Sequence, residues 1–295
     1  MLGDSVPHKL KHRVSQSSSI PKPYRDVQFK HILRTAWASA ALTFPMGVAL
    51  AVNKSSVSMI SRAEETDSEA WEPGLLANEI YYPGWLEGQW TTNSTCTGIV
   101  APLGIEAFGG QRAFNNAKRD INQWLIYTTR FVREASDDQK IVADRVYNVE
   151  SIAKSAMGAD SVLPFQQPDS NVARRLHLAA SPPGGDIVDV DLIPTDRLFR
   201  FSSETTFECM ERTAQLISTR INQLSPNPPP PARKDIETIT NYRFVDTNTI
   251  EAIQRTATFL TPADSRFAKL ERIEPSIGTR ALDVRFYHII YSRIN

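Results

Sequence analysis

The chain has 295 residues, with 33 basic and 33 acidic side chains, so its formal net charge is zero. The charge is unevenly placed: residues 1–60 hold eight Lys/Arg and two acids, which leaves 25 basic and 31 acidic residues in the remainder, a net charge of −6. An acidic domain with scattered basic residues argues against nucleic acid as a partner. The length is sufficient for one large β-domain, which is the organisation we expect.

The first 51 residues have the composition of a targeting leader. Residues 1–34 are basic, rich in serine and poor in acids, as in an organelle transit peptide. An apolar run over 36–52 follows and ends in Ala49-Leu50-Ala51, which has the small-x-small form of a signal-peptidase site. We expect a bipartite leader, 1–51, that is cleaved after Ala51. The alternatives are plain secretion and an uncleaved anchor, since the apolar run is at the short limit for a bilayer span.

An acidic flexible arm is expected over 52–77, and the β-domain over 78–295. The stretch 81–95 reads as the entry to the first strand. Pro83 fixes one backbone angle, Gly88 permits a tight bend, and β-forming residues dominate from Gln89 onward. Trp90 is then placed to close one end of a barrel, packed against the C-terminal strand.

The middle of the chain alternates between strand patterns and turn residues. The region 100–112 is expected to be a loop or short helix, 121–133 and 141–147 a pair of strands, and 151–157 a short helix closed by Gly158. Asp144 and Arg145 then fall on opposite faces of one strand, so we do not expect them to share a pocket. Further strands are expected near 174–179, and at 187–193 and 197–202 as a second pair. The sequence pattern of 207–220 is compatible with either a helix or a strand, and we favour a strand.

The last third gives the clearest pattern. The five prolines within 222–232 indicate a stiff surface insertion. Residues 235–245 and 249–260 predict a hairpin around Asp246-Thr247-Asn248. In the closing strand, 281–294, alternation places His288 on an apolar face with Val284, Phe286 and Ile290, and Arg285 and Tyr287 on the other.

Motifs that carry chemistry are missing from the sequence. It has no Walker loop, no dinucleotide glycine pattern, no HExxH and no Gly-x-Ser-x-Gly elbow. Cys96 and Cys209 are the only cysteines, without metal-ligand spacing, and buried free thiols are expected. We therefore predict no catalytic residues, no metal site and no cofactor, and lean towards a non-enzymatic protein.

Five segments occur in one order: 81–95, Val-Ala-Pro-Leu-Gly at 100–104, 142–148, 237–243 and the closing strand at 281–293. This series resembles the DUF6816 family of cyanobacteria and plastid-bearing eukaryotes, over roughly 81–293. The resemblance implies a mainly β fold, a single antiparallel lipocalin-like β-barrel with one or two short helices. With the leader, it implies a plastid protein of the thylakoid lumen. It carries over no catalytic residue.

Two functions from different classes remain open. The first is a lipocalin-like protein that binds a small apolar ligand such as a lipid or pigment. The second is a structural or assembly factor for a photosynthetic membrane complex, with a barrel filled by its own side chains; an undetected enzyme is a minor alternative. Membrane association is expected to be only peripheral unless the 36–52 run is retained. The expected cavity lining for a ligand is Trp90, Trp124, Tyr242, Phe244, Phe259 and Phe286.

Overall fold

The structure is a computed structural model, and it describes residues 79–163, 175–181, 187–220, 231–262, 264, 267–272 and 280–294. The predicted leader, the acidic arm and most of the Pro-rich insertion lie outside these residues. No helix in the described ranges is long and apolar enough to cross a membrane.

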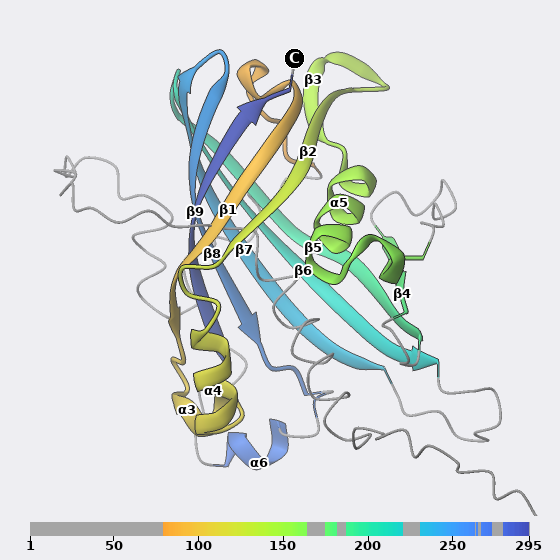
Figure 1. The fold of residues 1–295 in the computed structure, drawn as a ribbon, viewed down its shortest axis with the longest axis vertical. Helices are drawn as coiled ribbons and strands as arrows, with labels where there is room; N and C mark the ends of the chain where they lie inside the picture. The colour runs from red at the N-terminus through yellow and green to blue at the C-terminus, as the bar shows by residue number, and fades with distance from the viewer. Residues whose placement is uncertain are drawn as a thin grey trace, which may run out of the picture.

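Nine antiparallel strands form one curled sheet, a half-barrel, in the order β3-β2-β1-β9-β8-β7-β6-β5-β4 (Figure 1). The expected mainly β architecture is therefore confirmed. The strands are β1 (Gly88–Val100), β2 (Trp124–Glu134), β3 (Asp137–Ala143), β4 (Leu176–Ala180), β5 (Ile187–Ser203), β6 (Thr206–Arg220), β7 (Ala232–Asp246), β8 (Thr249–Phe259) and β9 (Asp283–Arg293).

The helices are short and lie at the lower end and at the open side of the sheet. Figure 1 shows α3 (Gly104–Phe108), α4 (Gln111–Lys118) and α6 (Phe267–Glu271) below the strands, and α5 (Arg145–Met157) between β2 and the β4–β5 pair. Four α-helices in the described residues exceed the one or two that we expected.

The sheet does not close by strand pairing, because β3 and β4 are its two ends. Helix α5 lies along the edge of β2 instead and satisfies its backbone with side chains. The Thr128 amide donates to Ser151 Oγ at 2.9 Å, and the Arg130 amide donates to Asn148 Oδ1 at 2.7 Å. On its other side, α5 packs Ala153 against a small apolar cluster of β4 and β5. The helix thus replaces the missing strand contact.

The start of α5 corrects one prediction. Strand β3 ends at Ala143, and the Asp144 carboxylate accepts from the Tyr147 amide as the N-cap of the helix. An Asp side chain satisfies an otherwise unpaired N–H of the first turn and so favours helix over a continued strand. The expected strand over 141–147 is therefore wrong beyond Ala143, whereas the predicted end at Gly158 is confirmed, with φ of 91°.

Two further strand predictions are corrected. Residues 187–193 and 197–202 do not pair with each other but form one long strand, β5, with a register shift between Pro194 and Asp196. Proline has no N–H to continue a ladder, which accounts for the irregularity. In β9 the face towards the interior carries Tyr287, Ile289 and Tyr291, so His288 lies on the outer face. The 207–220 region is a strand, as favoured, and the 235–260 hairpin is confirmed as β7 and β8.

Candidate functional site

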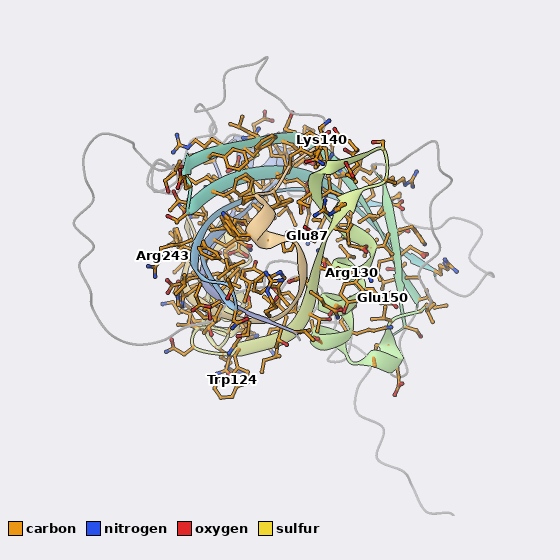
Figure 2. The ribbon with its side chains drawn as sticks, turned by 90° about the horizontal axis from the view of Figure 1, so that it is seen from above. Glu87, Trp124, Arg130, Lys140, Glu150 and Arg243 are labelled. Atoms are coloured by element: carbon orange, nitrogen blue, oxygen red, sulfur yellow. The ribbon has the colours of Figure 1, made fainter. Side chains whose placement is uncertain are left out.

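The upper mouth of the half-barrel is crossed by residues 79–87, which we call the strap. The strap contains the 3-10 turn η2 (Gly84–Leu86), and seen from above this turn lies within the ring of strands (Figure 2). The Tyr82 amide donates to the Ile141 carbonyl of β3 at 2.8 Å, and the Trp85 indole N–H donates to the Glu204 carbonyl between β5 and β6 at 3.2 Å. The strap therefore binds to both halves of the sheet.

Beneath the strap, aromatic rings contact one another inside the half-barrel. The Tyr82 ring lies 4.8 Å from Phe131, 5.4 Å from Phe207 and 6.2 Å from Tyr242, measured between ring centroids. Tyr242 in turn lies 5.8 Å from Tyr291. Burial raises the pKa of the Tyr82 and Tyr242 hydroxyls well above the ordinary value. Rings at these separations occupy this end of the interior themselves.

Trp90 is the largest fully buried side chain, with 0% of its surface exposed. Its indole N–H donates to the Leu86 carbonyl at 2.8 Å, and the Arg293 guanidinium lies 4.2 Å from the ring centroid. Arg293 also donates to the Thr247 carbonyl at 2.7 Å and to the Glu87 carbonyl at 3.0 Å. Trp90 pairs with Arg293 across β1 and β9, so the expected packing against the C-terminal strand is confirmed.

Gly88 is required at the junction between the strap and β1. Its φ is 119°, a conformation that other residues rarely adopt, and a Cβ built there meets Arg293 Nη1 at 2.7 Å. The tight bend expected at Gly88 is therefore confirmed, and it lets the guanidinium of Arg293 reach the ring of Trp90.

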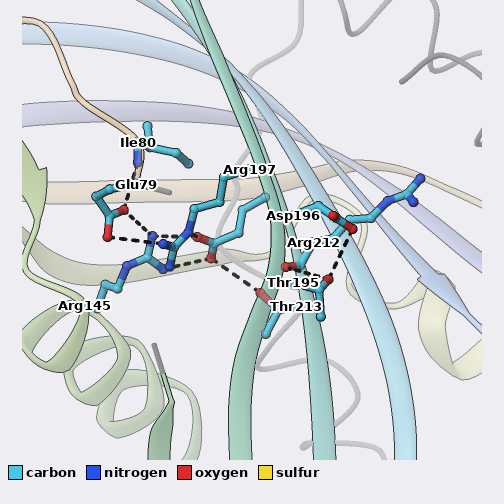
Figure 3. Close-up of polar contacts among 9 residues, drawn as sticks. Glu79, Ile80, Arg145, Thr195, Asp196, Arg197, Arg212 and Thr213 are labelled. Carbon is cyan, nitrogen blue, oxygen red and sulfur yellow. Dashed lines mark hydrogen bonds and ion pairs between the residues drawn. The ribbon is translucent and has the colours of Figure 1, made fainter. Parts of the chain in front are cut away.

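Four charged side chains form a network in the interior (Figure 3). Arg145 of α5 donates to Glu211 of β6 at 2.6 Å and to Glu79 at the start of the strap at 3.0 Å. Arg197 of β5 donates to Glu211 at 2.8 Å and to Glu79 at 3.3 Å. Two guanidinium and two carboxylate groups compensate each other, so the network joins α5, the strap and the sheet without adding net charge.

The pKa directions agree with this pairing. Burial disfavours the ionised form of Glu211, but the neighbouring Arg145 and Arg197 guanidinium groups outweigh it and hold the pKa of the carboxyl below its usual value. Burial also opposes the charge on Arg145, and Glu211 and Glu79 outweigh it, so the pKa of Arg145 is raised. The charges of Glu211 and Arg145 are therefore stable near neutral pH, and neither group is poised to exchange a proton there.

The structure brings together only part of the expected cavity lining. Trp90 and Tyr242 face the interior, and Phe244 lies at the mouth, with its ring 5.8 Å from that of Trp85. Trp124 is 74% exposed and points away from the strands in Figure 2, so the expectation that it lines a cavity is wrong. Successive residues of a strand point to opposite faces, and on β2 the buried Tyr127 lies on the face towards the interior, opposite to that of Trp124.

Phe259 and Phe286 are also corrected. They belong to a separate cluster with Ala257 and Val284 on the outer face of β8 and β9. On β8 the inward positions are Ile250 and Ala252, so alternation places Phe259 outward.

Sequence reasoning missed Glu79, Arg145, Arg197 and Glu211 as interior residues. A usable signal was present in β6, where Phe207, Cys209 and Glu211 recur at the strand period of two, which places a carboxylate on the same face as two buried apolar residues. The same period links Arg197 to Phe199 in β5. A charge on an apolar face predicts a buried partner of opposite charge.

In the described residues, the cysteines are buried and the two histidines pair with carboxylates. Cys96 and Cys209 are free and buried, as expected, and burial raises the pKa of their thiols to about 11 and about 12. Such thiols are protonated at neutral pH and are poor nucleophiles.

His177 contacts Asp189 and Asp191, and His288 contacts Glu251, all on the outer face. In the part of the chain that the structure describes, no group of His, Cys, Asp or Glu side chains has the geometry to hold a metal ion.

A family model described as "Domain of unknown function (DUF6816)" matches residues 74–281. The chain belongs to the DUF6816 family. The match covers the strap, the charged network and all strands up to the start of β9, and the suspected family is thereby confirmed. No curated protein and no solved structure matches the chain.

Proposed function

We propose that this DUF6816 protein is a non-enzymatic structural or assembly factor for a photosynthetic membrane complex, whose half-barrel is filled by its own side chains and whose outer surfaces make the contacts. The observation that carries this proposal is the ring cluster under the strap: Tyr82 lies within 6.2 Å of three other aromatic rings from three different strands. A ligand-binding barrel instead encloses an open cavity that is large enough for the ligand.

The charged network supports the same function. Glu79, Arg145, Arg197 and Glu211 direct their hydrogen bonds at one another, so they anchor α5 and the strap to the sheet. Buried charges in a small-molecule site usually meet the ligand's polar groups instead. The network therefore favours a rigid scaffold.

The compartment is part of the proposal. The basic, serine-rich segment 1–34 and the apolar run ending at Ala51 support import into a plastid followed by export to the thylakoid lumen. N-terminal sequencing of the protein purified from its own source tests this. We expect the mature chain to begin at Val52, and recovery of 36–49 in the mature chain would instead indicate a retained anchor.

One observation favours the second candidate, a protein that binds a small apolar ligand. Between β2 and β4 the wall is completed by α5 through side-chain hydrogen bonds such as that from the Thr128 amide to Ser151 Oγ, and not by a strand ladder. A helix held in this way can move more readily than a paired strand, which gives a route to the interior.

Native mass spectrometry of the full chain purified from its own source separates the two functions. We expect the mass of the polypeptide alone, and an unfolding midpoint that is unchanged after extraction with organic solvent. A lipid or pigment retained at one molecule per chain, with a midpoint that falls on extraction, would overturn the self-filled barrel and establish the second candidate.

A further inference from the structure

The outer wall of the half-barrel carries an exposed tryptophan at the start of β2. Trp124 is 74% exposed, and Ile126, on the same face of the strand, is 54% exposed. The next residues of that face are covered by α5, which contacts Thr128 and Arg130. Two adjacent exposed apolar side chains make a patch, and exposed apolar patches mark protein or membrane contacts more often than scattered single residues do.

Basic side chains precede this pair in the chain. Arg112, Lys118 and Arg119 are exposed on α4 and at its end, which lies directly below the start of β2 (Figure 1). The acid within this segment, Asp120, turns towards Arg285, which donates to its carboxylate at 3.0 Å. The segment 118–126 therefore holds two exposed basic side chains, an exposed tryptophan and an exposed isoleucine, and its one carboxylate, that of Asp120, pairs with the internal Arg285.

We propose that this surface, formed by Lys118, Arg119, Trp124 and Ile126, docks the protein on an anionic lipid bilayer. A tryptophan suits the headgroup level of a bilayer, because its ring is apolar and its N–H can reach water or lipid oxygens. Lysine and arginine beside it attract anionic headgroups at about 1 kcal/mol each. The convex outer wall of a curled sheet presents these side chains outward, which suits insertion into a lipid surface better than recognition of a protein groove.

This inference extends the proposed function, in which outer surfaces make the contacts, but it has a separate test. A ligand found inside the barrel would overturn the proposed function and leave the docking surface intact. Failure to bind lipid would remove the docking surface and leave the self-filled barrel intact.

The experiment is sedimentation of the full chain with vesicles of phosphatidylcholine alone and of phosphatidylcholine mixed with an anionic lipid. We expect binding to the anionic vesicles that weakens as salt is raised, and about tenfold weaker binding for the double variant Trp124→Ala/Ile126→Ala. The double variant Lys118→Ala/Arg119→Ala is expected to bind about thirtyfold more weakly. Fluorescence quenching by bromine-labelled lipid should fall in the Trp124→Ala chain.

Matched controls are available at the upper end of the molecule. Phe201 is an exposed aromatic (59%), and Lys140 and Arg243 are exposed basic residues, so Phe201→Ala and Lys140→Ala/Arg243→Ala remove the same kinds of group elsewhere. We expect both controls to bind vesicles like the unaltered chain. Equal binding by Trp124→Ala/Ile126→Ala and by Phe201→Ala would overturn the proposal. The proposal would also be overturned if the binding were equal because the 36–52 run alone holds the chain on lipid. Crosslinks from position 124 to a protein, in a chain that does not bind vesicles, would also overturn it.

Discussion

Trp90 is the residue on which the upper end of the half-barrel depends. Its ring is fully buried, its N–H is bonded to Leu86, and Arg293 covers one face. Truncating a buried aromatic residue typically costs about 3–5 kcal/mol, a large part of the roughly 5–15 kcal/mol that stabilises a domain. We expect Trp90→Ala to lower the urea midpoint sharply, even in protein extracted with solvent.

Trp124→Ala is the matched control for that measurement, because it removes the same side chain from an exposed position and should change stability by less than about 0.5 kcal/mol. If Trp90→Ala left the midpoint unchanged and removed a retained small molecule, Trp90 would be a binding residue at an open mouth.

The ion pairs of Glu211 predict how the stability of the fold depends on pH. Its pKa is lower in the folded protein than in the unfolded chain, so its ionised form stabilises the fold above the unfolded pKa of about 4.3. That stabilisation is lost as the pH falls from the unfolded pKa through the lower pKa of the folded protein. Removing one partner of a buried pair costs about 3 kcal/mol, the lower end of the usual range, because the Glu211 side chain keeps 23% of its surface exposed.

We therefore expect Glu211→Gln to be less stable at pH 7 and to lose less stability on acidification than the unaltered chain. Urea unfolding at a series of pH values measures both effects. Glu87→Gln is the control, since the Glu87 carboxylate pairs with Arg133 at an exposed site, where an ion pair contributes little to stability. Parallel pH curves for the unaltered and Glu211→Gln chains would show that Arg145 and Arg197 do not lower the pKa of Glu211.

At the scale of elements, α5 is the part that completes the wall, and its first turn depends on Asp144. The carboxylate accepts from the Tyr147 amide at 3.1 Å and from Arg130 at 2.5 Å. Losing an N-cap costs about 0.5–2 kcal/mol. We expect Asp144→Ala to destabilise the protein by about that amount and to speed hydrogen exchange of the first amides of α5.

Asp144→Asn distinguishes the two roles of the side chain, because an amide oxygen can still accept from Tyr147 but carries no charge for Arg130. We expect most of the stability to be retained. An Asn variant as unstable as the Ala variant would show that the ion pair with Arg130, and not the cap, holds the helix.

The elements also show where sequence reasoning succeeded. The β7–β8 hairpin was predictable because long alternation and the turn residues at 246–248 indicate the same structure. The first half of α5 was missed because a helical and a strand pattern are hard to distinguish over so few residues. The choice between them depends on one side chain, the N-cap Asp144. The site was predicted in part. Trp90 was placed correctly, whereas the Glu79–Arg145–Arg197–Glu211 network depends on contacts between residues up to 118 positions apart, from 79 to 197, which no local pattern encodes.

At the scale of the whole molecule, the sheet is a simple meander except at one junction. Every neighbouring pair of strands is consecutive in the chain apart from β1 and β9, which pair residue 90 with residue 293. The strap, Trp90 and Arg293 all lie at this junction, so the packing of the upper end requires both ends of the folded domain to be in place.

The β1–β9 pairing has a consequence for how the protein folds. Local hairpins can form early, but β1 and β9 must close a loop that contains nearly the whole domain, and the entropy of closing long loops slows folding. Because the two strands are adjacent, a circular permutant that runs from β4 through β9 and a short linker to the strap, β1, β2, β3 and α5 would make every strand pairing local. We expect that permutant to refold faster than the natural chain at similar stability, in stopped-flow fluorescence.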